Sequence, residues 1–212
     1  MSAGCCRSIA SGALIVIAIV VLVSGATLNG CTPEVPASKR RPQLIIDDSV
    51  AADFQALAVE TWDRFLTVFQ ARSDCFGDVR LRATRSLNSR AAYDPDSATV
   101  TMRVPGTPAM LQSALVHEWA HHIEFQCEAH KELRRAFLAA QGLPPDTAWR
   151  PDDTPANMPS SEWADIPSEQ YAEATIVLVL GRRQIPTRVR VKEEAVHVIA
   201  KWAAGESLEI RK

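Results

Sequence analysis

The sequence predicts an α+β domain, with a short antiparallel sheet followed by a series of helices. Apolar residues recur at helical spacing over residues 49–71, whereas residues 79–104 hold stretches in which apolar and polar side chains alternate, as in half-buried strands. Residues 107–203 return to helical patterns that glycine and proline interrupt. Because the strands and most of the helices fall in separate stretches, an α+β fold is expected.

The composition fits one globular domain with a leader. The chain has 212 residues, of which 47% are hydrophobic and 23% charged, so there is enough apolar material for a core. This excludes a disordered, collagen-like or disulfide-dense protein. The formal net charge of -2 gives no sign of the basic footprint that accompanies nucleic-acid binding, so no nucleic-acid partner is expected.

The N-terminal segment has the pattern of an export signal. Residues 8–33 contain no charged side chain and are mostly apolar. They include Leu28-Asn29-Gly30-Cys31, which resembles the bacterial lipobox, although a small or hydroxylated residue is usual at the position of Asn29. The resemblance implies that residues 1–30 are a lipoprotein signal peptide and that a lipid on Cys31 anchors the chain to the outer face of the cytoplasmic membrane. The alternatives are an uncleaved transmembrane anchor and an ordinary cleaved signal, and each version exports the rest of the chain.

The exported part divides into a tether and a folded domain. Residues 31–42 contain three prolines and the basic triplet Lys39-Arg40-Arg41, a composition typical of a semi-extended spacer. The folded domain is expected over residues 43–212. Its cysteines are Cys75 and Cys127, and two cysteines in an exported domain most often form a disulfide. Two buried free thiols are the alternative.

The first half of the domain is expected to contain a helix, a strand and a hairpin. Residues 49–71 predict an amphipathic helix, and residues 79–84 (VRLRAT) predict a half-buried strand. The strong turn signal Asp94-Pro95-Asp96-Ser97 separates residues 91–93 from residues 99–104, which predicts a β-hairpin.

Helices fill the second half, and each has a start or stop signal. Thr107 and Pro108 are typical of an N-cap and a first helical position, so a helix is expected from there to about Gln126. The remaining expected elements are a helix over residues 131–141 that stops at Gly142, a proline-rich loop over residues 142–167, a helix from about residues 165–168 to Leu180 that Gly181 ends, and a last helix over about residues 187–203.

The segment His117-Glu118-Trp119-Ala120-His121 carries the clearest chemical signal. It matches the H-E-x-x-H pattern inside a predicted helix, where residues four apart project from the same face. His117 and His121 can therefore each place a ring nitrogen on one zinc ion. Glu118 lies beside the metal, where it can act as general base toward a water molecule. A helix with surface histidines is the alternative.

A catalytic zinc needs a third protein ligand. In the extended pattern with a third histidine, the ligand would fall at residue 127 after a glycine at 124, but this chain has Cys127 and Glu124 there. A Cys127 thiolate would compete with the disulfide. Better candidates are Glu169 and Glu173, four residues apart on one helix face, because one can bind zinc while the other orients a ligand histidine. A solvated acidic helix face is the alternative.

The two motifs, HEWAHH and SEQYAEA, resemble those of the gluzincin metallopeptidases, whose third ligand is a glutamate on a later helix. The second motif is particularly similar to that of the catalytic domain of anthrax lethal factor. The resemblance covers these helices and a strand before them, and it implies a small zincin-like domain with Glu169 as ligand and Glu173 behind it. Residues 99–104 could supply a strand that lines the site. The family also typically has a Tyr or His oxyanion stabiliser, for which the sequence offers Tyr93, Tyr171, His122, His130 and His197.

Together these residues predict a zinc-dependent peptidase, an endopeptidase rather than an exopeptidase, that acts on peptide or protein substrates outside the membrane. The presence of Glu118 favours catalysis, because a structural zinc site has no use for a general base. An exported zinc-binding scaffold or pseudo-peptidase without catalysis is the alternative. Trp119, Trp149 and Trp163 are candidates for the wall of the cleft, although aromatic residues are more often in the core.

Overall fold

The structure is a computed structural model, and it describes residues 40–151 and 160–208. Cys31, the expected signal peptide and most of the expected tether lie outside the described residues. The elements follow in the order β1 (Leu44–Ile46), α1 (Ala52–Val68), η1 (Gln70–Arg72), β2 (Val79–Thr84), β3 (Ala91–Asp94), β4 (Thr99–Arg103), α2 (Pro108–Gln126), α3 (His130–Gln141), α4 (Ser160–Trp163), α5 (Pro167–Leu180) and α6 (Glu193–Ala203). The predicted α+β class is confirmed. In the described ranges, no helix combines the length and the apolar character that crossing a membrane requires.

The strands that the structure describes form one mixed sheet in the order β1-β2-β4-β3. β3 and β4 are the predicted antiparallel hairpin, with Tyr93 opposite Val100. β2, however, pairs in parallel with both β1 and β4, so the expectation of an antiparallel sheet is wrong for these pairs. The sequence did not indicate β1, because three residues are too short to show a period of two. Helix α1 returns the chain so that β1 and β2 run in the same direction, as a parallel pair requires.

The core lies between the inner face of the sheet and helices α1 and α2. Leu81, Val100 and Met102 alternate with more exposed residues along β2 and β4, and all three are fully buried. Trp119 of α2 packs edge-on against Trp62 of α1, with 4.9 Å between the ring centroids. Burial of large aromatic side chains is a major source of stability, and here it fixes α2 against α1.

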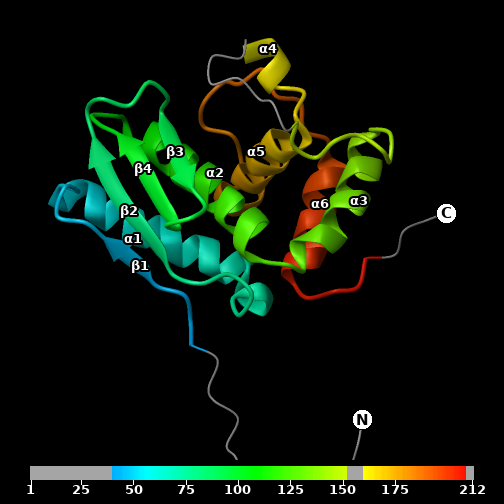
Figure 1. The fold of residues 1–212 in the computed structure, drawn as a ribbon, viewed down its shortest axis with the longest axis horizontal. Helices are drawn as coiled ribbons and strands as arrows, with labels where there is room; N and C mark the ends of the chain where they lie inside the picture. The colour runs from blue at the N-terminus through cyan, green and yellow to red at the C-terminus, as the bar shows by residue number, and fades with distance from the viewer. Residues whose placement is uncertain (1–39, 152–159, 209–212) are drawn as a thin grey trace, which may run out of the picture. The chain divides into compact units, whose positions relative to one another are not determined.

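Helix α2 lies between the sheet and α5, and α6 packs against both α5 and α3 (Figure 1). Both α2 and α5 are largely buried, as expected for helices with apolar residues on most of their faces. The polar residues that these two helices do bury are therefore conspicuous. Several of them lie where α2 faces α5.

The last helix begins later than its sequence pattern predicts. α6 starts at Glu193, and the expected start near residue 187 is wrong. Gln141 of α3 explains the difference, because its side chain accepts a hydrogen bond from the Lys192 N–H at 2.8 Å and donates one to the Arg190 carbonyl oxygen at 3.0 Å. These bonds satisfy backbone groups in an extended segment, so that segment does not need a helix.

Candidate metal centre

Helix α2 presents His117 and His121 on one face. The helix spans Pro108–Gln126, as the sequence predicts, and the Thr107 side chain caps it by accepting a hydrogen bond from the Met110 N–H at 3.3 Å. The two histidines are four residues apart, just over one turn, and their ring centroids are 4.9 Å apart. The capped helix thereby holds the two imidazole rings next to each other on one face.

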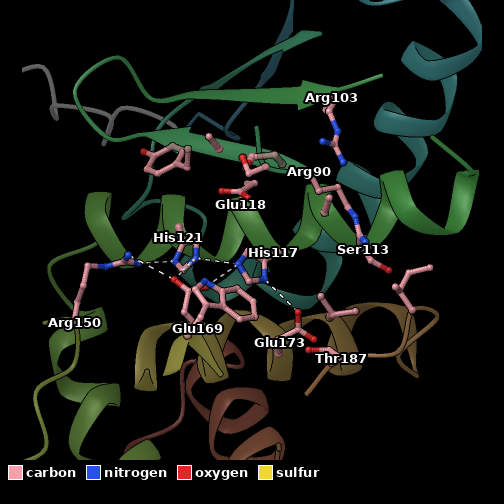
Figure 2. A pocket seen from close by; sticks show the side chains of 18 of the residues that line it. Arg90, Arg103, Ser113, His117, Glu118, His121, Arg150, Glu169, Glu173 and Thr187 are labelled. Atoms are coloured by element: carbon pink, nitrogen blue, oxygen red, sulfur yellow. Dashed lines mark hydrogen bonds and ion pairs between the residues drawn. The ribbon is translucent and has the colours of Figure 1, made fainter. Parts of the chain in front are cut away.

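Helix α5 supplies Glu169, whose carboxylate faces both rings (Figure 2). The distance from His117 Nε2 to Glu169 Oε2 is 3.0 Å, and that from His121 Nε2 to Glu169 Oε1 is 3.5 Å. The two Nε2 atoms are themselves 3.2 Å apart. All three residues are buried, and their potential ligand atoms lie within 4.8 Å of one another, so the group could hold a metal ion.

The outer ring nitrogens, Nδ1, each face another carboxylate. Glu173 Oε1 lies 3.5 Å from His117 Nδ1, in the position expected for a residue that orients this ring. His121 Nδ1 lies 2.9 Å from Glu124 Oε2, on the same helix. Carboxylates in this position fix the orientation of metal-binding histidines. Glu124 was not a sequence candidate for this position, although its spacing of three residues after His121 was a usable signal.

Burial and mutual charge shift the pKa values of this group strongly. Burial alone would raise the pKa of Glu169, but hydrogen bonds with His117 and His121 hold it well below its usual range. Burial likewise opposes ionisation of Glu124, yet His121 lowers the pKa of Glu124 to about 2. For His117 burial favours the neutral ring, whereas Glu169 and Glu173 raise its pKa to about 10. The group therefore binds positive charge, and a metal ion would replace protons there.

Glu118 lies beside this group but is not part of it. The residue is only 8% exposed, and its side chain lies on the side of α2 that faces the strands (Figure 2). Burial raises the pKa of its carboxyl group above the ordinary value. A carboxyl group with a raised pKa is better suited to take up and release a proton near neutral pH.

The group opens into a pocket of about 630 Å³ that Glu118 also lines. Strand β3 forms one wall through Ala91, Ala92 and Tyr93, whereas β4 contributes only Arg103. The expectation that residues 99–104 supply the lining strand is therefore wrong, because the hairpin places β3 outside β4 at the edge of the sheet.

Of the tryptophans expected near the cleft, only Trp163 lines this pocket. Its ring stacks on that of His117, with 5.7 Å between centroids and 18° between planes. Trp163 follows the segment of the long loop that lies outside the described residues, so this loop does contribute to the site.

The other two tryptophans lie away from the pocket. Trp119 is fully buried in the core, and Trp149 packs against His130 and Tyr171.

Among the candidates for an oxyanion stabiliser, only Tyr93 lines the pocket. Its hydroxyl lies 2.9 Å from His122 Nδ1, and burial raises its pKa to about 12. His122 is buried and also bonds to the Gly77 carbonyl oxygen at 3.0 Å, which indicates a structural role. Tyr171 and His130 contact each other in the core, at 4.6 Å between centroids, and His197 is exposed on α6.

Arg150 also lines the pocket, although no sequence pattern pointed to it. Its guanidinium group lies 3.4 Å from Glu124 Oε2 and 3.6 Å from Glu169 Oε1 (Figure 2). It lies in the loop after α3, so its proximity to the two glutamates depends on tertiary structure. The positive charge helps to keep Glu124 ionised.

Cys75 and Cys127 form a disulfide across 52 residues, which confirms the predicted pairing. Cys127 is the residue directly after α2, and Cys75 follows η1. A bonded Cys127 has no thiolate to offer, so the alternative in which it serves as the third metal ligand is excluded in this state.

The chain matches no family model, no curated protein and no solved structure. Its resemblance to the gluzincins therefore stays a prediction that depends on the two motifs.

Proposed function

We propose that this chain is a zinc metallopeptidase of the gluzincin type. One observation carries the proposal: two histidine Nε2 atoms and the Glu169 carboxylate meet in a pocket that Glu118 also lines. A structural metal site needs its ligands and the groups that orient them, but no further buried carboxylate such as Glu118. The pairing of a metal-binding group with a candidate base supports hydrolysis.

The donor set fits zinc. Zinc accepts imidazole nitrogen and carboxylate oxygen, and catalytic sites commonly provide three protein ligands with one position left for water or substrate. His117, His121 and Glu169 would hold the ion, and Glu173 and Glu124 would orient the two rings. When bound, zinc would polarise the scissile carbonyl and make a water molecule easier to deprotonate. Two histidines and one carboxylate also suit ferrous iron, which makes the identity of the metal part of the test.

Glu118 would move the proton during peptide hydrolysis. Its carboxylate takes a proton from the attacking water and then gives that proton to the nitrogen of the leaving amine. Because burial raises its pKa, the carboxyl group is suited to both halves of this transfer. Tyr93 and Arg150 line the same pocket and are candidates to stabilise negative charge on the carbonyl oxygen.

Strand β3 supports a peptide as the substrate. It is the outer strand of the described sheet, next to β4, and Ala91, Ala92 and Tyr93 line the pocket. An extended peptide can pair with the free edge of such a strand through backbone hydrogen bonds. Pairing of this kind does not require a free chain end, which favours an endopeptidase.

The proposed location is the outer face of the bacterial cytoplasmic membrane, with the chain anchored by a lipid on Cys31. The N-terminal sequence pattern supports this location. The Cys75–Cys127 disulfide agrees with it, because disulfides persist mainly in oxidising compartments.

The proposal is tested by metal analysis together with cleavage of a degenerate peptide library by the full chain. We expect about one zinc per chain, cleavage that a chelator abolishes, and recovery when zinc is restored. Bound iron in place of zinc, or no bound metal, would contradict the proposal. Bound zinc without any cleavage would instead support the zinc-binding scaffold or pseudo-peptidase.

A further inference from the structure

The charges that line the pocket are unevenly placed. Of the residues that the structure describes, three arginines and three glutamates line it: Arg90, Arg103, Arg150, Glu118, Glu169 and Glu173. The glutamates gather at the metal-binding group, and Arg150 lies within 4 Å of one of them. Arg90 and Arg103 lie on the side of His117 away from Arg150 (Figure 2). Among the described residues, neither has a carboxylate partner at ion-pair distance.

Arg90 and Arg103 are neighbours across the hairpin. The Arg103 N–H donates a hydrogen bond of 2.9 Å to the Arg90 carbonyl oxygen, which extends the β3–β4 ladder by one residue. Like charges directly opposite each other on antiparallel strands destabilise the pair. The guanidinium group of Arg103 is 3.4 Å from the Leu87 carbonyl oxygen, which leaves donors for another partner. An anion between the two arginines would relieve the repulsion.

Ser113 adds a neutral donor at the same end of the pocket. It lies on α2 one turn before His117, about 6 Å along the helix axis, and its residue is only 5% exposed. Its hydroxyl has no hydrogen-bond partner among the described residues. Thr61 and Thr175, in contrast, donate to the carbonyl oxygen four residues earlier in their helices. A buried hydroxyl without such a bond is costly unless water or a ligand completes it, so the Ser113 hydroxyl is available to a ligand in the pocket.

Figure 2 shows the Arg90 side chain extending along the pocket toward Ser113. Ser113, Arg90 and Arg103, here called the arginine end, thus offer hydrogen-bond donors and no carboxylate. A divalent cation at the metal-binding group would give the described lining of the pocket a net positive charge, because its arginines and glutamates are equal in number. Positive charge inside a pocket concentrates anionic ligands there.

We propose that the arginine end binds a carboxylate group of the peptide substrate and so determines which peptides are cleaved. Arginine binds carboxylates through paired hydrogen bonds, and Ser113 can donate a further one. The carboxylate is that of an Asp or Glu side chain, or that of the peptide C-terminus, located a short distance from the scissile bond. The choice of a peptide ligand depends on the proposed function, whereas the preference for a carboxylate depends only on the three side chains.

The test uses two degenerate hexapeptide pools with amidated C-termini that differ only in holding Glu or Gln at one fixed position. With the full chain, we expect the Glu pool to be cleaved with a kcat/KM at least tenfold higher at one position. The ratio of kcat/KM between the Glu and Gln pools should fall toward one in the Arg90→Gln/Arg103→Gln double variant. In Ser113→Ala this ratio should decrease by a factor of about three. Arg85→Gln is the control, because Arg85 is exposed near the hairpin but does not line the pocket. A third pool, with a free C-terminus and no acidic residue, tests the other source of the carboxylate. If the arginine end binds the peptide C-terminus, this pool should be cleaved with a higher kcat/KM than the amidated Gln pool.

If wild type cleaves all the pools with equal kcat/KM, the arginine end is not a carboxylate site. The same conclusion follows if the preference for the carboxylate persists in the double variant. Binding separates this failure from failure of the proposed function. The Glu118→Gln chain should bind a fluorescent Glu pool at least tenfold more tightly than the Gln pool, unless Arg90 and Arg103 are also replaced. If this difference is found but wild type cleaves nothing, the arginine end stands and the peptidase proposal fails.

Discussion

The two ring nitrogens of each histidine in the metal-binding group have different partners, so variants of the surrounding glutamates should differ in effect. Glu169→Ala removes one of three candidate ligands and should abolish tight zinc binding. Glu173→Ala and Glu124→Ala leave the ligands in place but release a ring, and each should weaken zinc binding by about 10–100-fold. Competition with a zinc-binding dye measures all three affinities. If Glu169→Ala binds zinc normally while Glu173→Ala does not, the two roles are exchanged.

His130 provides a pH-dependent contribution to stability. Burial holds its pKa down to about 3, with Arg134 and His121 acting in the same direction and Glu124 against it. The unfolded chain, with an ordinary value near 6.5, binds more protons between about pH 3 and 6.5. The free energy of unfolding therefore decreases as the pH falls through this window, by up to about 1.4 kcal/mol per pH unit.

Denaturant titration at pH 4.5 to 7.5 measures this slope. We expect it to be smaller in His130→Phe and His130→Gln, and unchanged in His197→Gln at an exposed histidine of α6. An unchanged slope in both His130 variants would contradict the assignment.

Single residues of the site were predictable where local spacing determines their neighbours. The i, i+4 spacing of His117 and His121 follows from helix geometry alone, and the similar spacing of Glu169 and Glu173 singled out the second helix. Arg150 was not predictable, because its approach to Glu124 depends on how a loop crosses the end of α2. The position of Arg150 depends on tertiary packing, and no periodic pattern in the sequence predicts it.

At the scale of elements, the disulfide fixes the end of α2 that carries Glu124 to the segment after α1. Closing a loop of 52 residues stabilises the folded chain by about 4 kcal/mol in the chain-entropy model. The Cys75→Ser/Cys127→Ser variant should lose about this much free energy of unfolding in guanidinium titration. Reduced wild type should match the variant. Two free thiols in unreduced, denatured protein from the native host would contradict the bond.

Helix ends were the most predictable feature of the elements. Thr107 and Pro108 mark the start of α2, and Gly142 and Gly181 adopt the left-handed conformation that ends α3 and α5. Strand β1 and the start of α6 were not predictable. β1 exists because β2 offers it a partner, and the extended segment before α6 exists because Gln141 binds its backbone.

At the scale of the whole molecule, the proposed N-terminal lipid anchor falls on residues outside those that the structure describes. Mass spectrometry of membrane-extracted protein should find an N-terminus at Cys31 with acyl chains attached. Cys31→Ser should release or misprocess the chain, because the thiol that receives the lipid is gone. A chain that still begins at Met1 would contradict the lipoprotein prediction and favour a transmembrane anchor.

In the proposed peptidase, the metal-binding group holds the ion and Glu118 transfers the proton, so the Glu118→Gln variant should separate these two roles. Zinc content and library cleavage should be measured on the same preparations of wild type, Glu118→Gln and the control Glu132→Gln, whose glutamate is exposed on α3. This division of roles predicts about one zinc per chain in all three proteins, with cleavage reduced at least about 100-fold in Glu118→Gln alone. Loss of zinc from Glu118→Gln, or cleavage equal to wild type, would contradict it.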